Sequence, residues 1–127
     1  MPSNAPKVLQ PNTYIAEADL VAHRFVKAGT AADGVIVCTA GAKAVGVTID
    51  DANNGEATAI ADSPSDKPLV ESSAAISAGA EIMSDGSGKA VTATSTNKIV
   101  GYALAAAAAS GQLIPVALTA HLAPTKA

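Results

Sequence analysis

The chain has 127 residues and a mass of 12.4 kDa, with 49% hydrophobic residues, 2% aromatic residues and a formal net charge of -3. This length is typical of one domain. A core without large aromatic side chains must rely on many small aliphatic contacts or on a subunit interface, so we expect a homo-oligomer. With 8 Lys and Arg residues, the chain offers no concentrated basic surface, which argues against nucleic-acid binding.

Residues 1–13 contain three prolines among polar residues, Pro2, Pro6 and Pro11. Proline lacks a backbone donor and biases the preceding residue toward extended conformations, so we predict an extended N-terminal arm. Such an arm is either frayed or lies along a partner surface, and the sequence leaves both possibilities open. The arm lacks the charged start and apolar stretch of a signal peptide, so we expect synthesis in the cytoplasm.

Residues 14–119 are predicted to form a β-rich domain, and residues 120–127 a C-terminal tail. Short runs of β-branched residues alternate with Gly, Asp, Asn and Pro, and turn signals recur about every ten residues. The predicted strands are 24–27, 34–39, 44–49, 57–61, 69–70, 81–83, 90–93, 99–104 and 113–118. This spacing predicts an all-β fold, a small sandwich or barrel with at most one or two short helical turns.

The connections between the strands carry distinct turn signals. Asn53-Asn54-Gly55 indicates a hairpin, because Asn-Gly supplies the positive φ values of a type I′ turn. The polar residues 63–68 are predicted to form an exposed loop, and residues 17–22 one brief helix. Residues 105–109 are all alanine, which favours a helix, but so short a helix is unstable alone. We therefore expect a short helical turn or a bulging loop there.

One motif occurs twice along the chain. Residues 43–49 have the sequence KAVGVTI, and residues 98–104 have the sequence KIVGYAL. The sequence therefore predicts two pseudo-repeated β-motifs within one domain. In each copy the valine, Val45 or Val100, is expected to face the core, and the following glycine is expected to permit close strand packing.

The flanks of this motif also resemble each other. The segment 25–29 matches 76–79, and the Asp-Gly pair at 33–34 matches the pair at 85–86. The offset between the copies then drifts from about 50 to about 56 residues, as expected if insertions fell in loops. Two copies are too few for a solenoid, so one compact domain is the better interpretation.

Three patterns suggest chemistry, but each has a simpler interpretation. Ser95 and Lys98 match the Ser-x-x-Lys pattern of some hydrolases, yet residues 93–97 are predicted to form a polar turn, not the required helix. The oxygen-bearing side chains of 50–56 do not reproduce EF-hand spacing, which favours a hairpin tip over a metal site. His23 and His121 lack the spacing of a zinc site.

The remaining candidates also favour a structural role. Cys38 lies in an apolar run and is predicted to be a small buried side chain rather than a reactive thiol. Residues 99–125 carry no formal charge, but their Gly, Pro, Gln and His residues argue against a transmembrane helix. No glycine-rich segment forms a nucleotide-binding motif. We therefore expect neither an enzyme nor a bound cofactor.

Several segments of strand and glycine-turn sequence together resemble a known protein family. These segments are 45–49, 54–56, 76–82, 85–91, 98–104 and 114–116. They resemble the small capsid decoration, or cement, proteins of tailed bacteriophages over residues 13–119, most strongly from 76 to 118. The resemblance implies a β-rich subunit that binds the outer surface of the expanded capsid between capsomers and stabilises the head against internal DNA pressure. It implies no catalytic residue.

The resemblance also implies partners and a location. The partners are the major capsid protein and other copies of the chain, with trimers on threefold positions favoured over dimers on twofold positions. The location is the outer capsid surface of the virion, after synthesis in the host cytoplasm. We hypothesise that the arm contacts the capsid through Pro2, Pro6, Lys7, Val8, Leu9, Pro11 and Asn12.

One alternative remains open at this point. The chain could be a carbohydrate- or surface-binding β-module of a virion or cell exterior. Such a module would require exposed aromatic side chains that stack on sugars, and this chain has only three aromatic residues, Tyr14, Phe25 and Tyr102.

Overall fold

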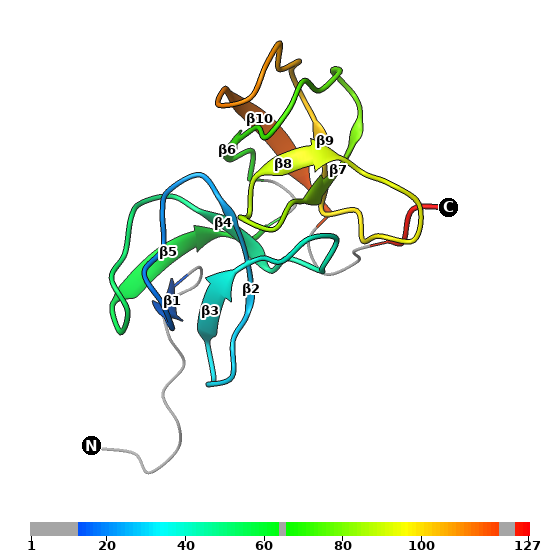
Figure 1. Cartoon of the computed structure of the whole chain (residues 1–127). Helices are drawn as coiled ribbons and strands as arrows, with labels where there is room; N and C mark the ends of the chain where they lie inside the picture. Colours follow the sequence, from blue (N-terminus) through cyan, green and yellow to red (C-terminus); the bar gives the residue numbers. More distant parts are fainter. Residues whose placement is uncertain (1–12, 64–65, 120–123) are drawn as a thin grey trace, which may run out of the picture.

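The computed structural model describes residues 13–63, 66–119 and 124–127, and within these ranges it contains strands and no helix. The predicted all-β class is therefore confirmed (Figure 1). The strands are β1 (Thr13–Ala16), β2 (Phe25–Ala28), β3 (Gly34–Val37), β4 (Gly46–Thr48), β5 (Ala57–Ala61), β6 (Leu69–Glu71), β7 (Glu81–Ser84), β8 (Ala90–Thr92), β9 (Gly101–Ala103) and β10 (Leu113–Leu118).

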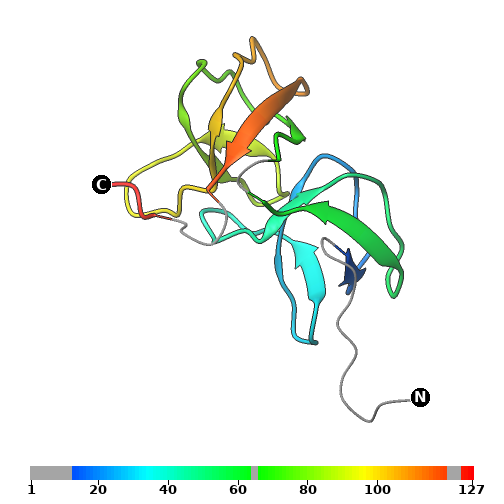
Figure 2. The same cartoon turned by 180° about the vertical axis from the view of Figure 1, so that it is seen from behind.

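The strands form two halves that follow one another along the chain. Strands β1 to β5 form a closed barrel in the order β1-β3-β2-β4-β5, and β6 to β10 form a five-stranded sheet in the order β6-β10-β9-β7-β8. Figures 1 and 2 show these halves as two adjoining lobes, the first coloured blue to green and the second green to orange. The second half thus repeats the first, with β6 to β10 in the places of β1 to β5.

The ends of the two sheets meet in corresponding ways. In the first half β1 pairs in parallel with β3, where Ala16 lies opposite Val35, and this pairing closes the barrel. In the second half Ser72, the residue after β6, makes one isolated parallel bridge to Ala90 in β8. The same closure therefore exists in both halves, but it is reduced to a single bridge in the second.

The pairing register of the strands is repeated as well. Val26 lies opposite Gly46 in the first half, and Ile82 lies opposite Gly101 in the second. Each strand residue of the second half follows its counterpart by 55 or 56 positions in every strand pair. This nearly constant offset confirms the predicted pseudo-repetition. The offset varies less than the sequence matches indicated.

The flanking correspondences predicted from the sequence are wrong. The register aligns Phe25 with Glu81 and Asp33 with Gly88, five and three residues later than the sequence matches placed them. Asp33 and Gly88 both have positive φ, at 56° and 79°. Loop conformation and strand pairing are therefore retained between the halves, whereas the loop sequences are not.

The two motif glycines lie where adjacent strands approach closely. A Cβ atom at Gly46 would overlap the carbonyl oxygen of Ala61 in β5. A Cβ atom at Gly101 would lie 2.6 Å from the carbonyl oxygen of Ala117 in β10. The predicted close packing is thus confirmed at both sites.

Each half has its own buried interior, and one cluster also joins the halves. The first cluster lies inside the barrel and consists of Ala16, Leu20, Val26, Val35, Ala52 and Ile60, with Val45 packed against it. The second cluster includes Ile82, Val100 and Val116, and it extends into the first half through Phe25 and Val47. Phe25 is fully buried, so the largest apolar side chain of the core holds the halves together.

The brief helix predicted at 17–22 is wrong. The backbone N–H of Glu17 donates to the carbonyl of Val35 over 2.9 Å, and Leu20 and Ala52 exchange hydrogen bonds of 2.7 and 3.0 Å. The backbone N–H of Ala22, which a helix would direct to the carbonyl of Ala18, donates instead to Asp51. Tertiary pairing here outweighs a weak helical propensity.

The alanine run 105–109 forms a bulging loop without a helical turn. Ala107 and Ile76 exchange two backbone hydrogen bonds, each of 2.9 Å. This bridge corresponds to the bridge between Leu20 and Ala52 in the first half, so the repeat register decides the conformation of the run. Of the two alternatives predicted there, the loop is confirmed.

The hairpin between β4 and β5 is confirmed, but its predicted turn type is wrong. A type I′ turn requires positive φ at both central residues, and of Asn54 and Gly55 only Gly55 has it, at 91°. The tip is instead tied to the segment after β1, because Gly55 donates to the carbonyl of Ala16 over 2.7 Å and Asn54 donates to a carboxylate oxygen of Asp19 over 2.9 Å.

Strand β1 was missing from the sequence prediction. It begins at Thr13, the last residue of the predicted arm, and its Ile15 lies opposite Ala57 in β5. The polar, proline-containing sequence before it hides a short run of β-formers, Thr-Tyr-Ile. The other nine strands lie within or next to their predicted ranges.

Candidate functional site

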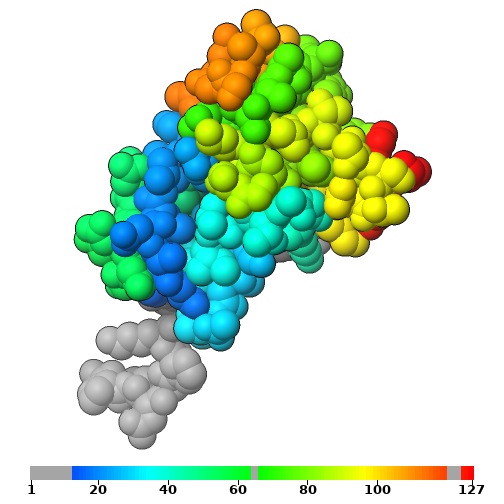
Figure 3. Space-filling view, viewed as in Figure 1, coloured from blue at the N-terminus to red at the C-terminus, as the bar shows by residue number. Residues whose placement is uncertain are grey.

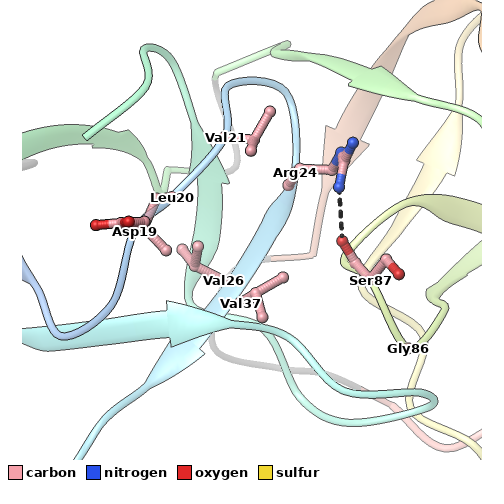
Figure 4. A pocket seen from close by; sticks show the side chains of 8 residues that line it. All are labelled: Asp19, Leu20, Val21, Arg24, Val26, Val37, Gly86 and Ser87. Atoms are coloured by element: carbon pink, nitrogen blue, oxygen red, sulfur yellow. Dashed lines mark hydrogen bonds between the residues drawn. The ribbon is translucent and has the colours of Figure 1, made fainter. Parts of the chain in front are cut away.

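A cleft lies where the two halves meet, between β2, β3 and the loop that joins β7 to β8 (Figure 4). Its volume is about 260 Å³. Its lining residues are Asp19, Leu20, Val21, Arg24, Val26, Val37, Gly86 and Ser87. Val21 and Val37 are 53% and 37% exposed, so the cleft has an apolar wall open to solvent.

The charged edge of this cleft is an ion-pair network across the junction. The Arg24 guanidinium lies 3.3 Å from one carboxylate oxygen of Glu71, and the Lys89 ammonium lies 3.2 Å from the other. The hydrogen bond from Lys89, aided by the charge of Arg24, lowers the pKa of Glu71 despite partial burial of the carboxyl. Two cations therefore share one carboxylate.

Arg24 is further held by the second half of the molecule. Its Nη1 donates to the carbonyl of Ser87 over 3.2 Å, as the dashed line in Figure 4 shows. No described group accepts a hydrogen bond from its buried Nε. Ser87 is the one hydroxyl in the cleft, and the lining provides no imidazole, thiol or lysine to activate it. The cleft is thus a junction that Arg24 spans through its hydrogen bond to Ser87.

A second groove, of about 290 Å³, lies at another part of the junction. It is lined by His23, Thr48, Ile49, Ala61, Lys67, Pro68 and Leu69. His23 adopts a positive φ of 66°, and its Nδ1 lies 3.1 Å from the carbonyl oxygen of Leu69. This contact ties the start of β2 to β6.

The exposed face of the second sheet carries four of the seven exposed large apolar side chains among the described residues. We define this outer sheet face by Leu69 on β6, Tyr102 and Leu104 on and after β9, and Leu113, Pro115 and Ala117 on β10. Side chains alternate along a strand, so these residues point away from the buried Val70, Ile114 and Val116. Sequence reasoning missed this face. Along 113–118 the residues of both faces are apolar, so the sequence pattern does not distinguish the exposed residues from the buried ones.

The serine and lysine of the hydrolase-like pattern do not form a catalytic pair. The Lys98 ammonium donates to the hydroxyl of Thr125 over 2.7 Å. Ser95 is exposed in a turn that also contains Thr96, whose φ of 71° is positive. The predicted polar turn is therefore confirmed.

The acidic residues near the β4–β5 hairpin serve as hydrogen-bond acceptors. Asp51 accepts from the backbone N–H of Ala22 over 2.8 Å, and Glu56 accepts from that of Asn53 over 2.7 Å. No group of three or more His, Cys, Asp or Glu side chains suited to a metal ion occurs within 13–63, 66–119 and 124–127. Asp51 and Glu56 thus lie at the predicted hairpin and hold backbone N–H groups there.

Cys38 has the predicted structural role. Its side chain is fully buried in the cluster that joins the halves, with its sulfur 3.6 Å from the carbonyl oxygen of Ala42. Burial raises the pKa of the thiol, which keeps it protonated at neutral pH.

The aromatic side chains do not gather on one surface. Phe25 is fully buried, and the Tyr14 hydroxyl donates to Asp62 over 2.6 Å. Tyr102 is 39% exposed on the outer sheet face. A sugar-stacking platform of several rings is therefore not formed by the described aromatic residues.

Some predicted features lie outside the described residues. These are the candidate capsid-binding residues Pro2, Pro6, Lys7, Val8, Leu9, Pro11 and Asn12, and also His121. Within the part of the chain that the structure covers, no helix is long and apolar enough to cross a membrane.

Comparisons with known proteins agree with this architecture. A family model described as phage cement protein matches residues 10–118, which include every strand. The N base of head fiber gp8.5 from bacteriophage phi29 has a similar fold, with a TM-score of 0.71 and 21% sequence identity over 84% of this chain and 91% of that one. No curated protein sequence matches the chain. Because the family model spans almost the whole chain, the protein belongs to the phage cement protein family and is a structural protein of the phage head.

Proposed function

We propose that this protein is a capsid decoration subunit that binds the outer surface of the expanded phage capsid between capsomers. There it stabilises the head against the pressure of packaged DNA. The observation that carries this proposal is the family match at 10–118, which covers both halves of the fold. The similarity to a phage head fiber base supports it, because the fold is shared with another phage head component.

The proposed subunit acts without catalysis and without a cofactor. Its polar groups support this role: Lys98, Asp51, Glu56 and Cys38 all make contacts that hold the fold. The protein is made in the host cytoplasm and joins the virion at the outer capsid surface. The subunit provides a surface that is complementary to the capsid, and it dissociates from the capsid slowly.

The subunit binds the major capsid protein and other copies of itself. We favour a trimer on threefold positions over a dimer on twofold positions. Many copies on one shell make modest individual contacts effective together, because each occupied position restrains the same lattice. The N-terminal residues Pro2, Pro6, Lys7, Val8, Leu9, Pro11 and Asn12 contribute to attachment as an extended arm.

The proposal is tested by cosedimentation of the protein with expanded, undecorated capsids. We expect saturable binding at a fixed ratio of subunits to capsomers, and a higher temperature of DNA release from decorated heads. Unexpanded procapsids are the control, and they should bind less protein. If expanded capsids bind no more protein than procapsids do, the proposed attachment is wrong.

A further inference from the structure

The outer sheet face concentrates the exposed apolar side chains of the molecule. Leu69, Tyr102, Leu104 and Leu113 are 43%, 39%, 46% and 46% exposed, and all four project from the same side of the second sheet. Large apolar residues scattered singly over a surface need no explanation, but a contiguous patch marks an interaction site.

The patch is contiguous because its members are cross-strand neighbours. Leu69 lies opposite Pro115, and the backbone N–H of Leu104 donates to the carbonyl of Pro115 over 2.9 Å. In the next row Tyr102 lies opposite Ala117. Neighbours of this kind have Cβ atoms about 5 Å apart, so their side chains touch and cover the backbone between them.

The second half carries larger apolar side chains here than the fold requires. Leu69, Leu113 and Pro115 correspond to Thr13, Ala57 and Ala59 in the first half. The same strand pairing is thus built with small or polar residues in the first half. The fold therefore does not require large side chains at these three positions, whereas Leu104 corresponds to Ile49, which is likewise exposed.

The edge of the patch carries no uncompensated negative charge. Glu71 lies beside Leu113 and is paired with Arg24 and Lys89, while Glu81 lies opposite Tyr102 and is paired with Lys126. The chain as a whole has a formal net charge of -3, so two copies repel each other over most of their surfaces. At this face the ion pairs of Glu71 and Glu81 reduce that repulsion.

We infer that the outer sheet face is the surface through which copies of this chain bind one another. The inference rests on the proposed function in one respect, since it assigns the interface of the proposed homo-oligomer. Interfaces between identical subunits are more apolar and less charged than those between proteins that also exist apart. An apolar face whose two carboxylates are both ion-paired thus fits a second copy better than it fits a separately folded capsid protein.

The test is the self-association of the full chain, measured by sedimentation velocity over a range of concentrations. The wild type is expected to be oligomeric. Leu104→Asp places a charge inside the interface, and we expect self-association to weaken by at least about 100-fold because the buried carboxylate has no partner. Val21→Asp is the matched control, since Val21 is 53% exposed in the junction cleft and should leave the oligomer unchanged.

Leu113→Asp provides a second variant at another part of the face, and Leu104→Ser a third that adds no charge. Circular dichroism melts show which variants are folded, and folded variants at either position should be monomeric or weakly associated. The inference is overturned if the wild type is monomeric, or if folded variants at Leu104 and Leu113 remain fully oligomeric.

Binding to expanded capsids separates this inference from the proposed function. If Leu104→Asp stays oligomeric but no longer binds capsids, the face contacts the shell, and the inference fails while the proposed function stands. If the wild type is oligomeric through this face but does not bind capsids, the proposed function fails and the inference stands.

Discussion

Gly46 and Gly101 show how one residue fixes the position of a strand in both halves. Each lies in the fourth strand of its half along the chain, and each faces a carbonyl oxygen of the following strand, at Ala61 or Ala117. Neither glycine has a positive φ, so steric space and not backbone conformation selects the residue. The repeated glycine is therefore a packing requirement.

Gly101→Ala should destabilise the protein by about 1–3 kcal/mol, because the added methyl group forces β9 and β10 apart. Gly86→Ala is the matched control, since no atom lies within 4 Å of the added Cβ and its φ is not positive. Urea unfolding of both variants measures the difference. Equal unfolding midpoints for the two variants would contradict the packing account.

Tyr14 makes the stability of the fold depend on pH in the alkaline range. Burial and the adjacent carboxylate of Asp62 raise the pKa of Tyr14 to about 12. The neutral phenol is favoured in the folded state, so this stabilisation is complete below the ordinary tyrosine pKa of about 10 and is lost as pH rises through 12.

Tyr14→Phe should remove this pH dependence, because it removes the ionisable hydroxyl and its 2.6 Å hydrogen bond to Asp62. We expect the unfolding midpoint of the wild type to fall more steeply than that of the variant between pH 10 and pH 12. Parallel curves over that range would show that the hydroxyl is not protected by the fold.

At the scale of strands and loops, the sequence predicts nine of the ten strands, because alternating β-branched runs between turn residues are a strong local signal. The wrong helix at 17–22 and the open choice at 105–109 have one physical cause. The segment 17–22 and the run 105–109 are decided by bridges to Ala52 and Ile76, which lie far away in the sequence. Local propensity cannot report such pairing, and only a correct repeat register predicts it.

The ion pairs of Glu71 connect β6 to the start of β2 and to the loop before β8. Because the pKa of Glu71 is lowered in the folded state, its stabilising effect is present above the ordinary carboxyl pKa of about 4.3 and is lost as pH falls through the folded value.

Glu71→Gln should therefore lower stability at pH 7 by about 1 kcal/mol or less, as is usual for solvent-accessible ion pairs, and should have little effect at pH 3. Thermal melts at the two pH values provide the measurement. Glu56→Gln is a suitable control at the exposed hairpin tip, away from the junction. A variant equally destabilised at both pH values would indicate a packing role instead.

At the scale of the whole molecule, the two halves are alike in topology but differ in what covers them. The N–H of Gly41 donates to Ser84 of the second half, whereas its counterpart Thr96 donates to the carbonyl of Lys126. Both residues have positive φ, at 68° and 71°. Residues 124–127 thus lie beside Thr96 in the second half. In the first half, the place beside the corresponding Gly41 is taken by the second half itself (Figure 3).

The sequence identifies the scaffold better than it identifies the binding surfaces. The motif of Val100 and Gly101 points to the core and to strand packing, and both interpretations hold. The outer sheet face could not be predicted, because it is assembled from three strands whose order the sequence does not reveal. Exposed leucines in a β-run are indistinguishable from core leucines until the pairing is known.

Deleting residues 2–12 should weaken capsid binding while the melting temperature stays unchanged, because the described strands begin at Thr13. The matched control replaces the same residues with a Gly-Ser segment of equal length, which keeps the reach of the arm but removes its prolines. Both variants should show reduced occupancy in cosedimentation. Full occupancy in the deletion variant would exclude the arm from attachment.

Imaging expanded, undecorated capsids mixed with the purified protein by electron cryomicroscopy tests the central claim most directly. We predict regular added density on the outer surface between capsomers, with the shape of a two-lobed subunit repeated around symmetry positions. Capsids that remain bare at saturating protein, or density on the inner surface, would contradict the account.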